Sequence, residues 1–180
     1  MESSHDFALS GAKGLAFWPT FVVVFLFDFG TKRWAEDFLP PMYTPHEILG
    51  NAVRLTLAYN KNAAMGLSLG AYSRVGFTLI AAAVLVVLGV LYRRTPAAGT
   101  GSATALALVA AGALGNLADR VMFAHGVVDF IDIGVGNVRF YTFNVADAAI
   151  TCGAILLGVL SMRRNRGPET SSGSAHTAQP

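Results

Sequence analysis

The chain has 180 residues, of which 53% are hydrophobic and only 13% are charged, whereas a soluble globular domain carries about 25% charged residues. This composition, with 19 glycines beside long apolar runs, is typical of closely packed transmembrane helices and excludes a disordered or collagen-like chain. The formal net charge of +2 is too small to indicate a nucleic-acid surface. The single cysteine, Cys152, cannot form an internal disulfide, and its apolar surroundings predict a small buried side chain.

Four segments are long and apolar enough to be membrane spans, since a bilayer core about 30 Å thick requires about 20 helical residues. In chain order, they are predicted at about residues 15–34, 73–92, 97–119 and 143–162. The first and the last reach spanning length only by including Asp28 and Asp147. Because a carboxylate is costly in hydrocarbon, we expect both to face a wet or protein-lined site near one membrane surface.

The segment between the first two spans predicts a small sheet outside the membrane. Val53, Leu55, Leu57 and Tyr59 alternate with polar or small residues, which is the pattern of a half-buried strand. Residues 138–141 are a candidate second strand. The expected fold class is therefore an all-α integral membrane protein with four transmembrane helices and a small extracytoplasmic β-sheet, formed by residues 1–164.

The distribution of basic residues predicts the orientation of the chain. Four spans place both termini on the side of the loop between the second and third spans, and the bases that directly flank long apolar runs gather there: Arg93, Arg94, Arg163, Arg164 and Arg166. The positive-inside rule makes that side cytoplasmic, although a count of all bases shows no bias. Residues 165–180, rich in Ser, Gly, Thr and Pro, predict a disordered cytoplasmic tail.

The start of the fourth span carries the sharpest polar motif, FNVAD at 143–147. Asn144 is a good helix N-cap, and Asp147 three residues later resembles the acid of a capping box. Since intramembrane acids are also a functional hint, a structural and a functional interpretation of Asp147 are equally open.

A second motif, GVVDFI at 126–131, embeds Asp129 among apolar residues. Asp129 is either an outward residue of a short strand or one half of a carboxylate pair. Two carboxylates brought close together share one proton, and an aspartic protease uses such a pair to polarise the scissile carbonyl and to activate water. Asp129 and Asp147 could meet in this way.

The third span closes with GALGNLADR at 112–120, which places Asn116, Asp119 and Arg120 on one helical face. The structural interpretation is a helix end with Arg120 at the membrane interface holding Asp119, while Gly112 and Gly115 serve helix packing.

The first span contains Asp28 and Lys32 four residues apart with the acid first, which favours an intrahelical ion pair. The four histidines make no metal-ligand spacing, so no metal is expected.

Taken in order, five motifs resemble those of the lipoprotein signal peptidases, the type II signal peptidase family: DFGTK at 28–32, NKNAAMG at 60–66, GALGNLADR, GVVDFI and FNVAD. By this resemblance the catalytic aspartate dyad is matched by Asp129 and Asp147. Positions that line the site and contact the substrate backbone are matched by Asn60, Asn116, Arg120 and Asn144. Positions that support the site are matched by Asp28, Lys32 and Asp119. Phe29, Asn62 and Met65 depart from the usual family residues but leave both catalytic positions intact.

The resemblance implies an aspartic endopeptidase of the bacterial cytoplasmic (inner) membrane, with its active site near the extracytoplasmic surface. Its substrates would be prolipoproteins that carry a diacylglyceryl group, cut on the N-terminal side of the lipidated Cys with water as the nucleophile. No cofactor and no nucleic acid are expected, and we expect a monomer surrounded by membrane lipid.

Two other classes stay open from the residues alone. A small transporter or proton-relay subunit would spread its acids across the bilayer depth, whereas residues 75–92 and 95–118 contain none. A non-catalytic assembly protein would tolerate Asn at Asp129 and Asp147.

Overall fold

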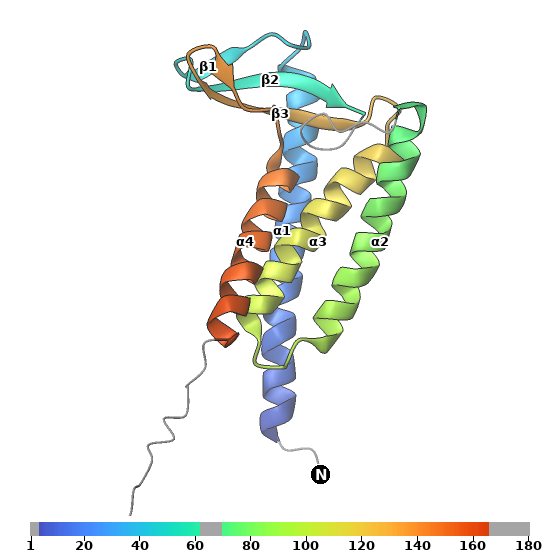
Figure 1. Cartoon of the computed structure of the whole chain (residues 1–180), viewed down its shortest axis with the longest axis vertical. Coiled ribbons are helices and arrows are strands. Elements are labelled where there is room, and N and C mark those ends of the chain that lie inside the picture. The colour runs from blue at the N-terminus through green and yellow to red at the C-terminus, as the bar shows by residue number, and fades with distance from the viewer. Residues whose placement is uncertain (1–3, 62–69, 166–180) are drawn as a thin grey trace, which may run out of the picture.

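The computed structural model describes residues 4–61 and 70–165, and its four long helices run side by side with a small sheet across one end (Figure 1). The helices are α1 (Ser4–Phe38), α2 (Ser73–Arg94), α3 (Thr100–Met122) and α4 (Val145–Asn165). Each contains a segment long and apolar enough to cross a membrane. The expected fold class is therefore confirmed. A helix lies at each of the four expected spans, and α1 extends beyond the expected 15–34 at both ends. The expected disordered tail lies outside the described residues, apart from Asn165 at the end of α4.

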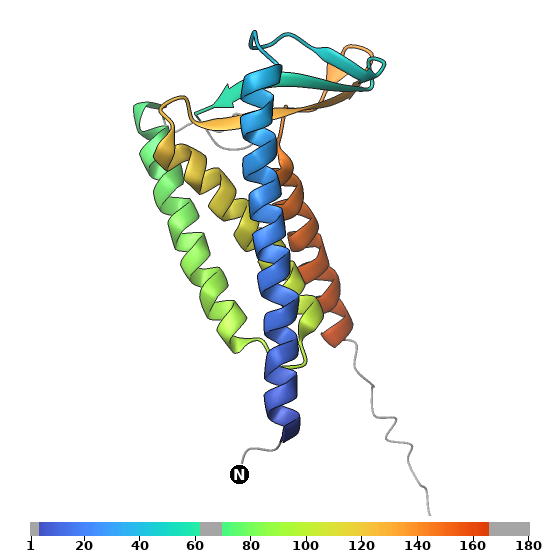
Figure 2. The same cartoon turned by 180° about the vertical axis from the view of Figure 1, so that it is seen from behind.

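Helix α3 forms the centre of the bundle, because small residues cover much of its surface and allow its neighbours to approach closely. It contacts α1, α2 and α4, and α1 crosses in front of it in the view of Figure 2. A Cβ atom added at Gly112 would collide with the carbonyl of Ala146, and one added at Gly115 would collide with the Asp28 carboxylate. The packing role expected for these two glycines is confirmed.

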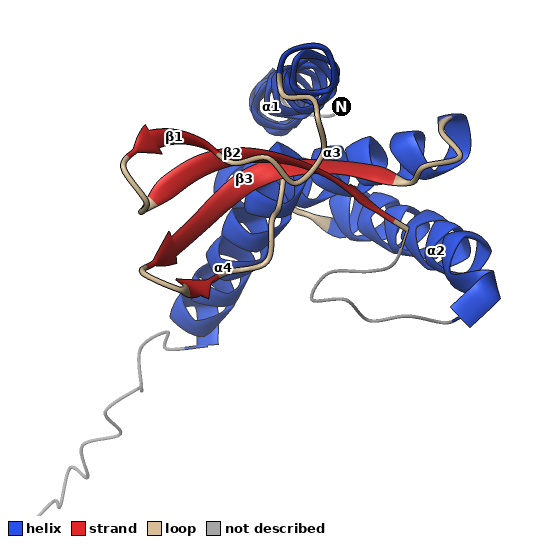
Figure 3. Cartoon of the chain, turned by 90° about the horizontal axis from the view of Figure 1, so that it is seen from above, coloured by secondary structure: helices blue, strands red, loops and turns tan. Residues whose placement is uncertain are grey.

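The sheet contains β1 (His46–Leu49), β2 (Val53–Asn60), β3 (Val127–Val135) and β4 (Val138–Arg139), paired antiparallel in that order. The predicted strand at 53–59 is confirmed as β2, and the candidate strand at 138–141 is reduced to β4. Viewed from above, the sheet lies across the ends of the helices (Figure 3). A small apolar core holds it there, in which Ala35 of α1 and Leu39, directly after α1, meet Leu57, Val128 and Phe130 of the sheet.

A buried acid joins three of the strands at the far end of the sheet. Asp132 of β3 accepts hydrogen bonds from Arg54 and Arg139, each at 2.7 Å to the nearest guanidinium nitrogen, and from Thr56 at 3.1 Å. Burial acts to raise the pKa of Asp132, but the hydrogen bonds from Arg139 and Arg54 outweigh it and hold the pKa below its ordinary value. The carboxylate therefore ties β2, β3 and β4 together away from the helices.

Candidate active site

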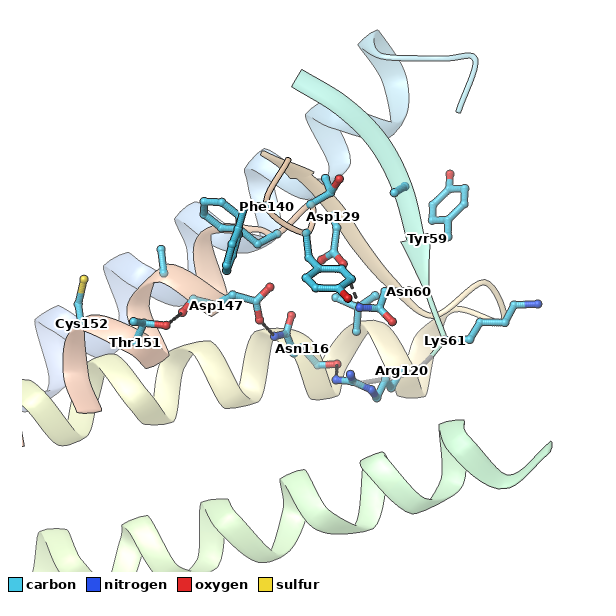
Figure 4. A pocket seen from close by; sticks show the side chains of 16 residues that line it. Tyr59, Asn60, Lys61, Asn116, Arg120, Asp129, Phe140, Asp147, Thr151 and Cys152 are labelled. Carbon is cyan, nitrogen blue, oxygen red and sulfur yellow. Dashed lines mark hydrogen bonds between the residues drawn. The ribbon is translucent and has the colours of Figure 1, made fainter. Parts of the chain in front are cut away.

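An open cleft of about 620 Å³ lies between the sheet and the upper parts of α3 and α4 (Figure 4). Its walls come from β2, α3, β3, the segment 140–143 and the first turns of α4. Five of the six residues expected to be catalytic or to bind substrate line it: Asn60, Asn116, Arg120, Asp129 and Asp147. The sixth, Asn144, is fully buried behind them.

Asp129 lies within β3 and is only 3% exposed, so the interpretation as an outward strand residue is wrong. Its Oδ1 accepts a hydrogen bond from the Asn144 amide at 2.7 Å, and its Oδ2 accepts one from the Asn60 amide at 3.1 Å. Asn60 comes from the neighbouring strand. Gly126 allows this approach, because its φ of +95° suits glycine and a Cβ there would collide with the Asn60 carbonyl.

The pKa of Asp129 is raised to about 7, first by burial and second by the negative charge of Asp147. The hydrogen bonds from Asn60 and Asn144 act in the opposite direction without cancelling this effect. At neutral pH the Asp129 carboxyl is therefore close to half protonated.

Asp147 is held by a reciprocal capping box at the start of α4. The Asn144 side-chain oxygen accepts from the Asp147 backbone N–H at 2.9 Å, and the Asp147 carboxylate accepts from the Asn144 backbone N–H at 3.3 Å. The capping interpretation is confirmed, but it does not exclude a functional one, because the same bonds aim the carboxylate into the cleft. Asn144 thus contacts both acids, one with its amide and one through the cap.

A charged cluster beneath the cleft sets the orientation of Asn116. The Nζ of Lys32 lies 2.8 Å from Asp28, 3.1 Å from Asp119 and 2.9 Å from the side-chain oxygen of Asn116. Because this oxygen accepts from the ammonium group, the Asn116 amide nitrogen is left to donate to Asp147, at 2.8 Å. The ion pair expected between Asp28 and Lys32 is confirmed and extends as far as the cleft.

The two supporting acids also join other parts of the fold. Asp28 accepts a hydrogen bond from the backbone N–H of Ala146 at 2.8 Å, which fixes the start of α4 against α1. Asp119 was expected to be held by Arg120. Among the described residues its ion pairs come instead from Lys32 and from Arg33, at 3.0 Å, while Arg120 lines the cleft.

Several cleft residues were not anticipated from the sequence. The aromatic run at 140–143 forms one wall, and its position directly before FNVAD is the signal that could have indicated it. Cys152, expected to be buried, is exposed and lines the cleft beside Thr151, because that face of α4 is turned away from the other helices.

Among the described residues, no three His, Cys, Asp or Glu side chains are grouped to hold a metal ion. The departures at Asn62 and Met65 lie outside the described residues.

Comparison with known proteins gives a family for this geometry. A family model described as "Signal peptidase (SPase) II" matches residues 20–163, which is most of the chain. The chain belongs to the signal peptidase II family. The lipoprotein signal peptidase of Cellvibrio japonicus is 38% identical over 137 residues, covering 75% of this chain and 79% of that protein. The lipoprotein signal peptidase of Pseudomonas paraeruginosa is 38% identical over 159 residues, covering 87% and 92%.

Solved structures agree with this family. A structure described as "Bacterial membrane enzyme structure by the in meso method at 2.3 A resolution" has a TM-score of 0.74 and 26% identity, covering 92% of this chain and 95% of its own. A second, described in the same words at 1.9 A, has a TM-score of 0.72 and 29% identity, covering 83% and 94%. The resemblance inferred from the five motifs is confirmed, and with it a peptidase of a bacterial membrane. The transporter and assembly interpretations are set aside.

Proposed function

We propose that this signal peptidase II cleaves prolipoproteins that carry a diacylglyceryl-modified cysteine, with Asp129 and Asp147 as its catalytic pair. The observation that carries the proposal is the position of the two carboxylates. They come from separate segments, line one cleft and are both contacted by Asn144. An aspartic peptidase requires such a pair in different protonation states.

We assign different roles to the two acids from their environments. Asp129, whose pKa is raised to about 7, holds the proton and donates it toward the oxygen of the scissile carbonyl. Asp147 accepts hydrogen bonds from the Asn116 amide and from the Asn144 backbone, which orient its carboxylate in the cleft, and it takes a proton from the attacking water. The hydroxide adds to the carbonyl carbon. The tetrahedral species then breaks its C–N bond as Asp147 returns the proton to the leaving amine, and Asp129 takes its own proton back from the hydroxyl group as the carbonyl re-forms. Neither a metal nor a covalent enzyme intermediate is needed.

The position of the exposed side of the cleft supports the proposal that the substrate carries a lipid. Thr151 and Cys152 are exposed on α4 inside the segment Val145–Arg164, which is apolar enough to cross a membrane. The cleft therefore opens partly at the depth of the lipid, where diacyl chains can remain while the peptide bond reaches the acids. Asn60 and Arg120, on the opposite wall, are placed to hydrogen-bond the substrate backbone.

We also propose that the enzyme acts as a monomer in the inner membrane, with cytoplasmic termini and an extracytoplasmic cleft. Described basic residues lie at both ends of the bundle. At the end opposite the sheet, where α1 begins and α2 and α4 finish, the bases directly flank the apolar spans, which supports this orientation: Lys13, Arg93, Arg94, Arg163 and Arg164.

The test is cleavage of a synthetic diacylglyceryl prolipoprotein by purified wild type, Asp129→Asn and Asp147→Asn in detergent, with the folding of each variant checked by thermal unfolding. Both variants should fold and lose cleavage. Asp37→Asn is the matched control, because Asp37 is exposed at the end of α1, and it should cut normally. If either folded Asp→Asn variant kept near-normal turnover, the substituted aspartate would be a helix cap or a structural acid and not a catalytic residue. Failure of the wild type to cut would overturn the substrate assignment.

A further inference from the structure

A second concavity lies at the end of the bundle opposite the cleft. This groove, of about 510 Å³, runs between the end of α2, the start of α3 and the last turns of α4. Its floor includes Leu91, Leu106, Leu157 and Leu160, and its lining also includes Arg94 and Arg164. It shares no residue with the cleft, so peptide hydrolysis does not account for it.

Among the side chains that the structure describes, those charged at the groove are all basic. Every Asp and Glu whose side chain is described lies toward the sheet end: Asp28, Glu36, Asp37, Glu47, Asp119, Asp129, Asp132 and Asp147. No described carboxylate is therefore available to neutralise Arg94 and Arg164, both of which are exposed. Lys13 does not add to the groove, because its ammonium group donates to the carbonyls of Tyr92 and Thr95, at 2.8 Å each.

The polar groups beside the arginines suit a phosphate group. The lining includes Ser102 and Ser161, whose hydroxyls can donate to phosphate oxygens, whereas the hydroxyl of Thr95 donates to the Leu91 carbonyl at 2.9 Å. Helix α3 also begins here, at Thr100, and its N-cap Gly99 supplies no side-chain cap. The first backbone N–H groups of a helix favour an anion, and guanidinium groups bind phosphate in bidentate fashion.

We propose that the groove binds one anionic phospholipid from the adjacent leaflet, with its phosphate at Arg94 and Arg164 and an acyl chain along the leucine floor. A soluble anion would leave the apolar floor unused, and a neutral lipid would leave the two arginines unused. Only an anionic amphiphile complements both parts. Basic pockets between transmembrane helices are known to suit such headgroups.

The first test compares Arg94→Gln/Arg164→Gln with Arg93→Gln/Arg163→Gln. The two double variants lose the same charge from adjacent positions, but only the first pair lines the groove. Phosphatidylglycerol or phosphatidylcholine is titrated into each protein in neutral detergent, and bound lipid is counted by native mass spectrometry. We expect wild type and the Arg93/Arg163 variant to retain one phosphatidylglycerol, and the Arg94/Arg164 variant to bind it on the order of 20-fold more weakly.

A second variant tests the acyl chain. Gly158 lines the groove, and a Cβ added there meets no atom within 4 Å, so we expect the ring of Gly158→Phe to fill the groove. Gly89→Phe is the control, because Gly89 is also exposed and a Cβ there also meets no atom within 4 Å. Only Gly158→Phe should displace the lipid. Equal retention of phosphatidylcholine by wild type, unchanged binding in the Arg94/Arg164 variant or full competition by glycerol 3-phosphate would each overturn the proposal. Cleavage activity is not the readout, so this test is independent of the proposed peptidase mechanism.

Discussion

Replacing Lys32 with Met would remove the cation shared by two buried carboxylates beneath the cleft. Lys32 is 0% exposed, and its Nζ lies 2.8 Å from Asp28 and 3.1 Å from Asp119. Arg33 would still neutralise Asp119, at 3.0 Å. Asp28, also fully buried, would keep only its hydrogen bond from the Ala146 backbone. Leaving one buried charge uncompensated destabilises a protein by about 3–5 kcal/mol.

The same substitution should disturb the chemistry. Without the ammonium group, the Asn116 side-chain oxygen loses its donor at 2.9 Å and keeps only the weaker hydrogen bond from the Asn144 amide at 3.2 Å, so the amide nitrogen is held less firmly toward Asp147. A small misplacement of a catalytic group can lower the rate by about 10²-fold. We therefore expect Lys32→Met to lose both stability and turnover.

The assay is equilibrium unfolding in mixed micelles for Lys32→Met, Asp28→Asn and the double variant. Asp28→Asn keeps the oxygen that accepts from Ala146 while removing the charge. If an uncompensated Asp28 carboxylate is the cause, the double variant should recover about 0.5–3 kcal/mol relative to the sum of the single changes. Additive losses, or a Lys32→Met protein as stable as the wild type, would refute the reasoning.

Four further predictions concern the cleft and the packing beneath it. Turnover should fall about tenfold per pH unit above pH 7 as Asp129 loses its proton, and a pH–rate profile that stays flat to pH 9 would contradict this. The raised pKa also means that the stability contributed by Asp129 is complete below its ordinary pKa of 3.8 and is lost as the pH rises through about 7; thermal unfolding of Asp129→Asn should lack this decline. Gly115→Ala should lower the unfolding temperature and turnover by displacing Asp28, whereas Gly30→Ala, where a Cβ meets nothing within 4 Å, should do neither. A bulky thiol reagent should react with Cys152, obstruct the cleft and inhibit the wild type, but leave Cys152→Ser active. Equal inhibition of both proteins would show that the reagent does not act through Cys152.

The sequence alone was sufficient for features that depend on neighbouring residues. Apolar runs of spanning length indicate membrane helices, because a helix satisfies all of its backbone hydrogen bonds within one segment in lipid. The three-residue spacing of Asn144 and Asp147 indicates a capping box, and the four-residue spacing of Asp28 and Lys32 indicates an ion pair, because helical geometry brings such positions together. The ordered motifs also indicated the family.

Only the tertiary structure decided which distant groups meet. The pairing of β2 with β3 brings Asn60 to Asp129, and the close approach of α3 to α4 at Gly112 and Gly115 brings Asn116 to Asp147. Local spacing likewise could not predict the partners of Asp119 or the exposure of Cys152. Strand register and helix packing join segments that are far apart in the chain, so no short pattern of residues encodes the distance between two such side chains.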